Sequence, residues 1–407
     1  MIMLCYHSII LSQTNIIIDK ITVYGNNITK ETVILRELLF KKNSQLSYND
    51  LKNKILESEK NLLNLSLFNF VDIQHTVKEN IVEININLIE RWYIWPYPIL
   101  EISDRNFNTW WKEFKSNDYY DFSRLNYGIF LNWGNFRGKN DILKLKLRKG
   151  FKEHYLISYM MPYFNKKKTI GINTYAQLFR RKKSFYNTIN DTLIYYTDPN
   201  NYTTKEYELS SQILFRKSIY NKHLIKFTYN IAIVDQEIVK NNPFYLHNDK
   251  NSGSYTKLSY QFISDHRDFI QYPLNGYYVD FESSKYFNGT SPVNHFEIIG
   301  RIEKHIELEK NIFLGSSFKF KITSDEYQPY FMQKGFGFED YVRGYEYYVV
   351  DGQEFWLSKT ILKYALFKNK KFDIPYIKME QFRKSHFSLY IGMFSDMGYI
   401  IDNQNNK

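Results

Sequence analysis

Hydrophobic positions in residues 16–91 follow a strand pattern, then two helical patterns, then two further strand patterns. Ile16 to Tyr24 predicts the first strand, and Gly25-Asn26-Asn27 predicts the turn after it. Thr29 can cap the first helix, and Ser47-x-x-Asp50 resembles a capping box for the second, with Asp in place of the more usual Glu. The predicted apolar positions are Ile34, Leu35, Leu38, Leu39, Leu51, Ile55 and Leu62 in the helices, and Val71, Ile73, Val77, Val82, Ile84, Ile86 and Leu88 in the last two strands. This order predicts a small α+β domain.

From about residue 97 the pattern has a period of two residues. Between Ile142 and Arg148, three leucines face one way, while Lys144, Lys146 and Arg148 face the other. The same alternation recurs at 206–215, 225–233, 257–262 and 318–322. Many of these segments reach about ten residues, the length that crosses a bilayer when the strand is tilted. The region therefore predicts two-faced strands long enough to span a membrane.

The links between these strands alternate between short and long. Residues 134–141 and 218–223 form short links, whereas 180–204 and 235–254 form long ones. Transmembrane barrels have short turns on one side and longer loops on the other. A soluble sandwich also alternates, but its polar face looks at bulk water. Strands in lipid must pair all their backbone groups, so the interpretation we favour is a closed antiparallel transmembrane β-barrel.

The pattern predicts thirteen barrel strands, which is an odd number. They begin near residues 97, 124, 141, 154, 169, 205, 223, 254, 276, 294, 311, 355 and 386. The chain then ends in the polar residues 402–407, without the aromatic-ended final strand of a bacterial barrel. Against an expected sixteen strands, this predicts a truncated product that lacks about three strands, or roughly 50 residues. The alternative is that the strand count is wrong.

Composition and motif content refine this picture. Mean hydropathy is −0.47, yet aromatic residues reach 18%, with 36 Tyr and 32 Phe, as the aromatic girdles of a barrel require. The net charge of +11 is spread over strands and turns without a nucleic-acid motif, so we expect no nucleic-acid partner. The single cysteine, Cys5, excludes a disulfide framework.

With no Gly-x-Ser-x-Gly, no His-Glu-x-x-His and no clustered metal ligands, we predict no catalytic residue, no cofactor and no metal, and thus no enzyme.

The first fifteen residues have a composition of their own. Met1 to Gln13 contain a short apolar run without the usual basic start. We interpret residues 1–15 as the remnant of a secretory signal peptide that ends near Ser12 to Thr14. An ordinary disordered terminus is the alternative.

Residues 16–91 resemble a polypeptide-transport-associated (POTRA) domain. The resemblance rests on the element order, on Val23-Tyr24-Gly25-Asn26, and on Leu67-Phe68-Asn69-Phe70-Val71 before the second strand. It implies a periplasmic domain whose exposed sheet edge accepts an extended client segment by β-augmentation.

Residues 92–407 resemble the barrel of the BamA/TamA outer membrane protein family, also known as the bacterial surface antigen type. Val342-Arg343-Gly344-Tyr345 looks like that family's Val-Arg-Gly-Phe/Tyr signature, and Phe394-Ser395-Asp396-Met397-Gly398 resembles its Phe-x-Asp-x-Gly motif. Asp104-Arg105-Asn106-Phe107 and Tyr272-Pro273-Leu274-Asn275-Gly276 agree with it. Each motif is weak alone, but their order and spacing together are specific.

The resemblance implies that the link carrying Arg343 folds into the barrel interior. Asp396 shares strand parity with Ser388, Tyr390 and Gly392 and should point inward, where it can form a bidentate pair with Arg343. Gly344 would permit the tight turn. The alternative is an exposed Arg343 and a strand-end Asp396, whose pair would be worth less than about 1 kcal/mol.

One stretch departs from the family pattern. Members often carry Glu-x-Arg-Phe-Pro in the strand after the loop, where the Glu supplies a second carboxylate for the arginine. Here the matching stretch is Ile361-Leu362-Lys363-Tyr364-Ala365, which has no acid. We expect either a loop that is held less firmly, or Glu346 or Glu354 as the substitute.

The function implied by the resemblance is outer-membrane protein assembly, in which the POTRA domain receives clients and the barrel inserts them. The implied partners are unfolded outer-membrane protein clients, the lipid bilayer, and periplasmic or lipoprotein accessory subunits. A channel that translocates a polypeptide or a lipid is the alternative in the same fold. An outer-membrane enzyme or a purely structural barrel is less well supported.

Overall fold

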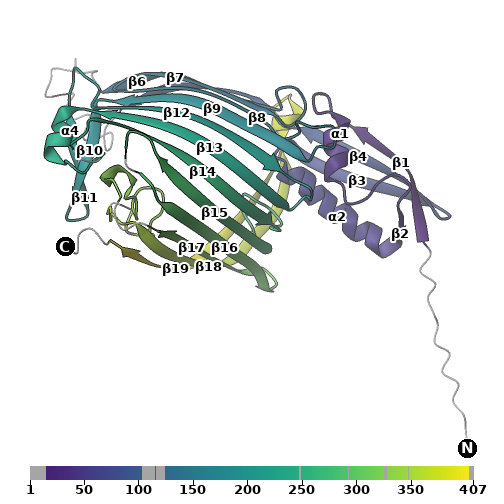
Figure 1. Ribbon diagram of the computed structural model, residues 1–407. Helices are drawn as coiled ribbons and strands as arrows, with labels where there is room; N and C mark the ends of the chain where they lie inside the picture. Colours follow the sequence, from purple (N-terminus) through teal and green to yellow (C-terminus); the bar gives the residue numbers. More distant parts are fainter. Residues whose placement is uncertain are drawn as a thin grey trace, which may run out of the picture. The chain divides into compact units, whose positions relative to one another are not determined.

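The computed structural model describes residues 15–102, 115, 124–246, 249–291, 293–324, 328–346 and 348–402 (Figure 1). These residues divide into two compact units. One contains the chain up to Trp92 together with Ile374–Arg383, and the other contains the rest. Within the described residues, no helix is both long enough and apolar enough to cross a membrane. Residues 1–14 of the predicted signal segment and the Asp104–Phe107 stretch lie outside the described residues.

The first unit is a four-stranded sheet with two main helices. Its elements are β1 (Asn15–Tyr24), α1 (Glu31–Glu37), β2 (Gln45–Ser47), α2 (Tyr48–Asn64), β3 (Phe68–Lys78) and β4 (Ile81–Glu90), with α5 (Glu380–Arg383) joining them from later in the chain. The strand order is β2-β1-β4-β3, and β1 runs parallel to β4. The predicted order of elements is therefore present, with the short β2 as an addition. Its core includes the fully buried Ile18, Ile34, Leu51, Leu62, Ile84 and Ile86.

The two helix starts differ in how they are capped. Ser47 is the N-cap of α2, and its hydroxyl accepts the backbone N–H of Asp50 at 3.2 Å, as the sequence predicts. The N-cap of α1 is Lys30, so the predicted Thr29 cap is wrong. The reason is the carboxylate of Glu90, which accepts the backbone N–H groups of Ile28 and Thr29 and holds this segment one residue ahead of the helix.

The second unit is built on a thirteen-stranded antiparallel sheet in which each strand pairs with the next (Figure 1). The strands are β5 (Ile94–Ile102), β6 (Leu125–Gly134), β7 (Ile142–Gly150), β8 (Lys152–Met161), β9 (Ile170–Arg181), β12 (Thr204–Phe215), β13 (Asn221–Val234), β14 (Ser252–Asp265), β15 (Gly276–Asn288), β16 (Phe296–Glu309), β17 (Ile312–Thr323), β18 (Glu354–Asp373) and β19 (Lys384–Ile401). All thirteen predicted strands are confirmed. In the described part of the chain, β5 and β19 form the two edges of the sheet and do not pair with each other.

The two faces of this sheet differ in polarity. On β12 and β13 the apolar Leu209 and Phe227 are 51% and 48% exposed, whereas the neighbouring Ser210 and Thr228 are 1% and 8% exposed. Inward residues from β12 to β18 line shared cavities, so the sheet curves with its polar face inside. A water-soluble sheet hides its apolar face instead. The observed arrangement is that of a transmembrane barrel wall.

The long links carry elements of their own. A hairpin of β10 (Lys183–Ile189) and β11 (Thr192–Thr197) lies between β9 and β12, α4 (Gln236–Asn241) follows β13, and a 3₁₀ turn, η1 (Tyr330–Met332), follows β17. The buried Val234, Ile238, Val239, Tyr245, Leu246 and Tyr330 form one cluster, against which Phe185 and Tyr196 pack. The hydroxyls of Thr188 and Tyr330 are 2.7 Å apart. Three links that are distant in sequence therefore pack together.

Candidate functional site

The link between β17 and β18 lies against the inner face of the sheet. Lys319 on β17 forms an ion pair with Asp340 in the link, with 2.6 Å between Nζ and Oδ2. Gln328 and Gln353, near the two ends of the link, are almost fully buried. The link is thus held against the inner face of the curved sheet.

The turn at the sequence motif in this link is Val342-Arg343-Gly344-Tyr345. The N–H of Tyr345 donates to the carbonyl of Val342 at 2.9 Å, which closes a four-residue β-turn. Gly344 has φ +92°, and a Cβ added there would meet nothing within 4 Å. The third position of a type II turn needs positive φ, so the backbone conformation, rather than space, calls for glycine.

Arg343 and Asp396 form a bidentate ion pair. The Arg343 Nε donates to Asp396 Oδ2 at 2.8 Å, and Nη2 donates to Oδ1 at 2.5 Å. The backbone N–H of Arg343 also donates to Oδ2, at 3.1 Å. The Asp396 side chain is 1% exposed and that of Arg343 is 28% exposed. The carboxylate is therefore covered by the turn that it binds.

Two further residues of the Phe394–Gly398 motif contact the link. The guanidinium carbon of Arg343 lies 3.9 Å from the centre of the Phe394 ring, a close cation–π contact. A Cβ on Gly398 would come within 2.4 Å of a ring carbon of Phe336 and 3.2 Å of Val342 Cγ2. Phe394 therefore supports the arginine, and Gly398 leaves the room that the link occupies. The sequence motif did not reveal either contact.

The structure also shows what the two acids proposed as substitutes contact. Glu346 Oε1 accepts the backbone N–H of Gly344 at 3.1 Å. Glu354 Oε1 accepts the backbone N–H of Thr323 at 3.1 Å. Among the described residues, neither acid pairs with Arg343, whose ion-pair partner is Asp396. The Glu346 carboxylate instead stabilises the turn by binding the backbone N–H of Gly344.

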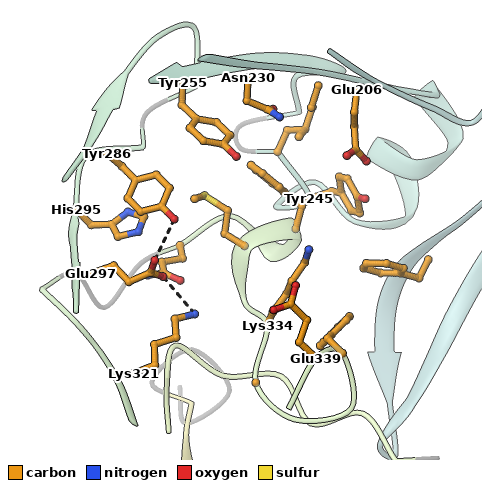
Figure 2. A pocket seen from close by; sticks show the side chains of 18 of the residues that line it. Glu206, Asn230, Tyr245, Tyr255, Tyr286, His295, Glu297, Lys321, Lys334 and Glu339 are labelled. Carbon is orange, nitrogen blue, oxygen red and sulfur yellow. Dashed lines mark hydrogen bonds and ion pairs between the residues drawn. The ribbon is translucent and has the colours of Figure 1, made fainter. Parts of the chain in front are cut away.

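An internal cavity of about 440 Å³ lies between the link and strands β12 to β18 (Figure 2). Its wall carries both charges: Glu297 accepts a hydrogen bond from the Tyr286 hydroxyl at 3.2 Å and pairs with Lys321 at 3.6 Å. Lys334 and Glu339 reach it from the link (Figure 2). Among the described residues, no group of three or more His, Cys, Asp or Glu side chains could hold a metal ion. The wall of this cavity is thus polar and carries charges of both signs.

Asp351, near the end of the link, has an altered titration. Burial raises its pKa to about 6, and the carboxylates of Asp402 and Asp191 act in the same direction, while a hydrogen bond with Thr188 opposes them. Its Oδ1 is buried without a partner among the described residues. Asp351 therefore makes this end of the link sensitive to pH.

Comparisons with known proteins agree with this architecture. Residues 16–91 match the POTRA family described as a surface antigen variable number repeat, and residues 135–355 match the Omp85 superfamily domain. The crystal structure of BamA from Haemophilus ducreyi lacking POTRA domains 1–3 is similar, with 15% identity and a TM-score of 0.50, over 96% of this chain and 73% of that one. CdiB from Escherichia coli aligns with 9% identity and a TM-score of 0.49, over 88% of this chain and 63% of that one. No curated protein sequence matches significantly.

Proposed function

The chain belongs to the Omp85 superfamily, which acts in insertion or translocation at the bacterial outer membrane, and from this premise we propose that it is an assembly factor for outer-membrane proteins. In this proposal the first unit lies in the periplasm and receives unfolded clients, and the thirteen-stranded unit inserts them into the bilayer. The observation that carries the proposal is the turn at Arg343, clasped by Asp396 inside a sheet whose outer face is apolar.

The POTRA sheet offers a place for a client strand. In the strand order β2-β1-β4-β3, the outer strands are the three-residue β2 and the eleven-residue β3. Only β3 is long enough to pair with an extended client over several residues. Glu59 accepts the backbone N–H of Ile73 on β3 at 2.9 Å, so a client strand adding at this edge displaces that side chain.

Insertion by this route exchanges hydrogen bonds and needs no nucleotide. A client strand that leaves water must keep its backbone groups paired, and an open strand edge supplies the partners. The link between β17 and β18, fixed by the Arg343–Asp396 ion pair, would keep the sheet curved while client strands pair with its edge strands. The proposal assigns no catalytic residue, cofactor or metal to the chain, and it includes accessory periplasmic or lipoprotein subunits as partners.

A translocation channel is the second candidate, and the polar interior cavity favours it. Side chains such as Glu206, Asn230 and Lys321 line a space through which a polypeptide or lipid headgroup could pass (Figure 2). Both candidates use the same fold, and they differ in what is lost when the protein is removed.

Depletion of the protein in its own host, followed by quantitative proteomics of the outer membrane and the medium, tests the proposal. Assembly predicts the loss of many unrelated barrel proteins from the outer membrane. Translocation predicts the loss of a single exported substrate with the barrel proteins unchanged. An unaltered outer membrane and medium would contradict both candidates. Re-expression of the chain should restore the lost proteins, and re-expression of Arg343→Ala should restore them less well.

A further inference from the structure

A second cavity, of about 280 Å³, lies beside the Arg343 turn and is strongly basic. Strands β16, β17 and β18 and the link between β14 and β15 form its wall. The cationic or titratable basic side chains that line it are Arg267, Arg301, His305, Arg343, Lys359 and Lys363. Glu303 is the one carboxylate among its lining residues, all of which are described.

The arginines of this cavity are neutralised within the protein. Arg267 pairs with Asp265 at 2.8 Å and with Glu303 at 3.1 Å. Arg301 also pairs with Glu303, and Arg343 pairs with Asp396. Three guanidinium groups are thus balanced by three carboxylates.

The two lysines are not neutralised in this way. Lys363 is buried, and its ammonium group donates to the carbonyl of Pro273 at 3.2 Å and lies 4.1 Å from the centre of the Tyr272 ring. The ammonium group of Lys359 lies 4.5 Å from the centre of the Tyr341 ring. Among the described residues, neither ammonium group has a carboxylate within ion-pair distance. Carboxylates such as Asp396 and Glu303 therefore act on these two charges only from beyond ion-pair distance. An anion bound in this partly enclosed space would offset the cost of burying the two ammonium groups.

The imidazole of His305 also indicates a place for an anion in this cavity. Its Nε2 lies 3.3 Å from Glu303 Oε2, while its Nδ1 is buried without a hydrogen-bond partner in the described part of the chain. Gly315 provides the space for this ring, because a Cβ there would come within 2.8 Å of Nδ1. The cavity wall thus holds a polar atom that lacks a partner.

We propose that this cavity binds a phosphate-type dianion between Lys359, Lys363 and His305. Two ammonium groups without a directly paired carboxylate match the two charges of hydrogen phosphate or of a phosphate monoester. The half-exposed guanidinium of Arg301 supplies further donors. The same chemistry is presented by free phosphate and by the phosphate headgroup of a lipid. Lys359 is the register partner of Asp396 on β19, so an anion here binds next to the clasp of Arg343.

Isothermal titration calorimetry of the full-length protein in an uncharged detergent, at constant ionic strength, tests this site. One arm uses inorganic phosphate and the other uses dihexanoyl phosphatidic acid. We expect saturable binding in at least one arm, weakened tenfold or more by Lys359→Gln with Lys363→Gln. Binding of the lipid alone identifies a headgroup as the source, and binding in both arms identifies the phosphate group itself.

The matched control is Lys144→Gln with Lys146→Gln on β7, which removes the same charge from the inner face away from the cavity. The control should bind as the unaltered protein does. Equal weakening in both double variants, or no effect of either, would overturn the site. Heat-dependent mobility on gels checks that each variant is folded. If the test variant does not fold, the unaltered protein still decides, because the absence of saturable binding in both arms refutes the proposal.

Discussion

Replacement of Arg343 by alanine should release the turn from the sheet interior. The change removes the hydrogen bonds from Nε and Nη2 to Asp396 and leaves a carboxylate that is 1% exposed without its counter-charge. It also removes the cation that lies over the Phe394 ring. Among the described residues, the backbone N–H of residue 343 would remain as the hydrogen-bond donor to this acid.

The structure sets the size of the effect between two limits. Breaking a fully buried ion pair costs about 3–5 kcal/mol, while an exposed pair is worth about 0.2–1 kcal/mol. Because the Arg343 side chain is 28% exposed and Asp396 is covered, we expect the bound turn to lose about 2–3 kcal/mol. This corresponds to a roughly 30- to 140-fold larger population of the released turn.

Amide hydrogen exchange of the folded protein in lipid nanodiscs measures this population. The reporters are the N–H of residue 343, which binds Asp396, and the N–H of Tyr345, which closes the turn. In Arg343→Ala, the protection of these two amides should fall by the stated factor. In Arg343→Lys, their protection should be intermediate between that of the unaltered protein and that of Arg343→Ala, because lysine keeps the positive charge but not the bidentate guanidinium. A double-mutant cycle of Arg343→Ala with Asp396→Ala should give a coupling energy that accounts for most of the stability lost in Arg343→Ala. Unchanged protection in Arg343→Ala would refute the reasoning.

Three further changes test the same region. Gly398→Ala places a Cβ 2.4 Å from the Phe336 ring, so it should weaken docking of the link by about 1–3 kcal/mol. Proteases should then cleave within residues 335–345 faster than in the unaltered protein. An unchanged cleavage rate would contradict this expectation. Gly344→Ala forces φ +92° on a residue with a Cβ, which should cost about 1–2 kcal/mol. Hydrogen exchange should show this cost as reduced protection of the turn amides. Gly344→Asn should reduce that protection less, because asparagine tolerates positive φ better than alanine. Asp351 keeps its proton more firmly in the folded link than in an unfolded chain, because burial raises its pKa from 3.8 to about 6. Its contribution to stability is thus complete below about pH 4 and is lost as the pH rises to about 6. Exchange corrected for its intrinsic pH dependence should show this loss, and Asp351→Asn should abolish it.

The strand pattern of the large unit could be predicted from the sequence because one face of each strand is apolar and the other polar. Leu143, Leu145 and Leu147 alternate with basic residues on β7, and the thirteen strand starts follow from such segments. The β10–β11 hairpin was missed because its strands are short and aromatic on both faces. Asn190 and Asp191 at its tip both have positive φ, which is a two-residue hairpin signal that the sequence does contain.

The site was only partly predictable for a similar reason. The motif order located Arg343 and Asp396, since each occurs in a short recognisable signature. The contacts of Gly398 with Phe336, and of Lys363 with Pro273, join segments that are distant in sequence and carry no shared pattern. The sequence showed that an acid was missing from residues 361–365, but it could not show that a basic cavity lies there.

Spin-label accessibility on β12 tests the central claim, a sheet with lipid outside and polar contacts inside, most directly. In a Cys5→Ser background reconstituted in liposomes, nitroxides are placed at Ile213→Cys on the outer face and at Gln212→Cys on the inner face. We predict that the label at position 213 collides with oxygen and is shielded from a water-soluble nickel complex, while the label at 212 is less accessible to oxygen. Equal access of the nickel complex to both positions would contradict a membrane-embedded sheet.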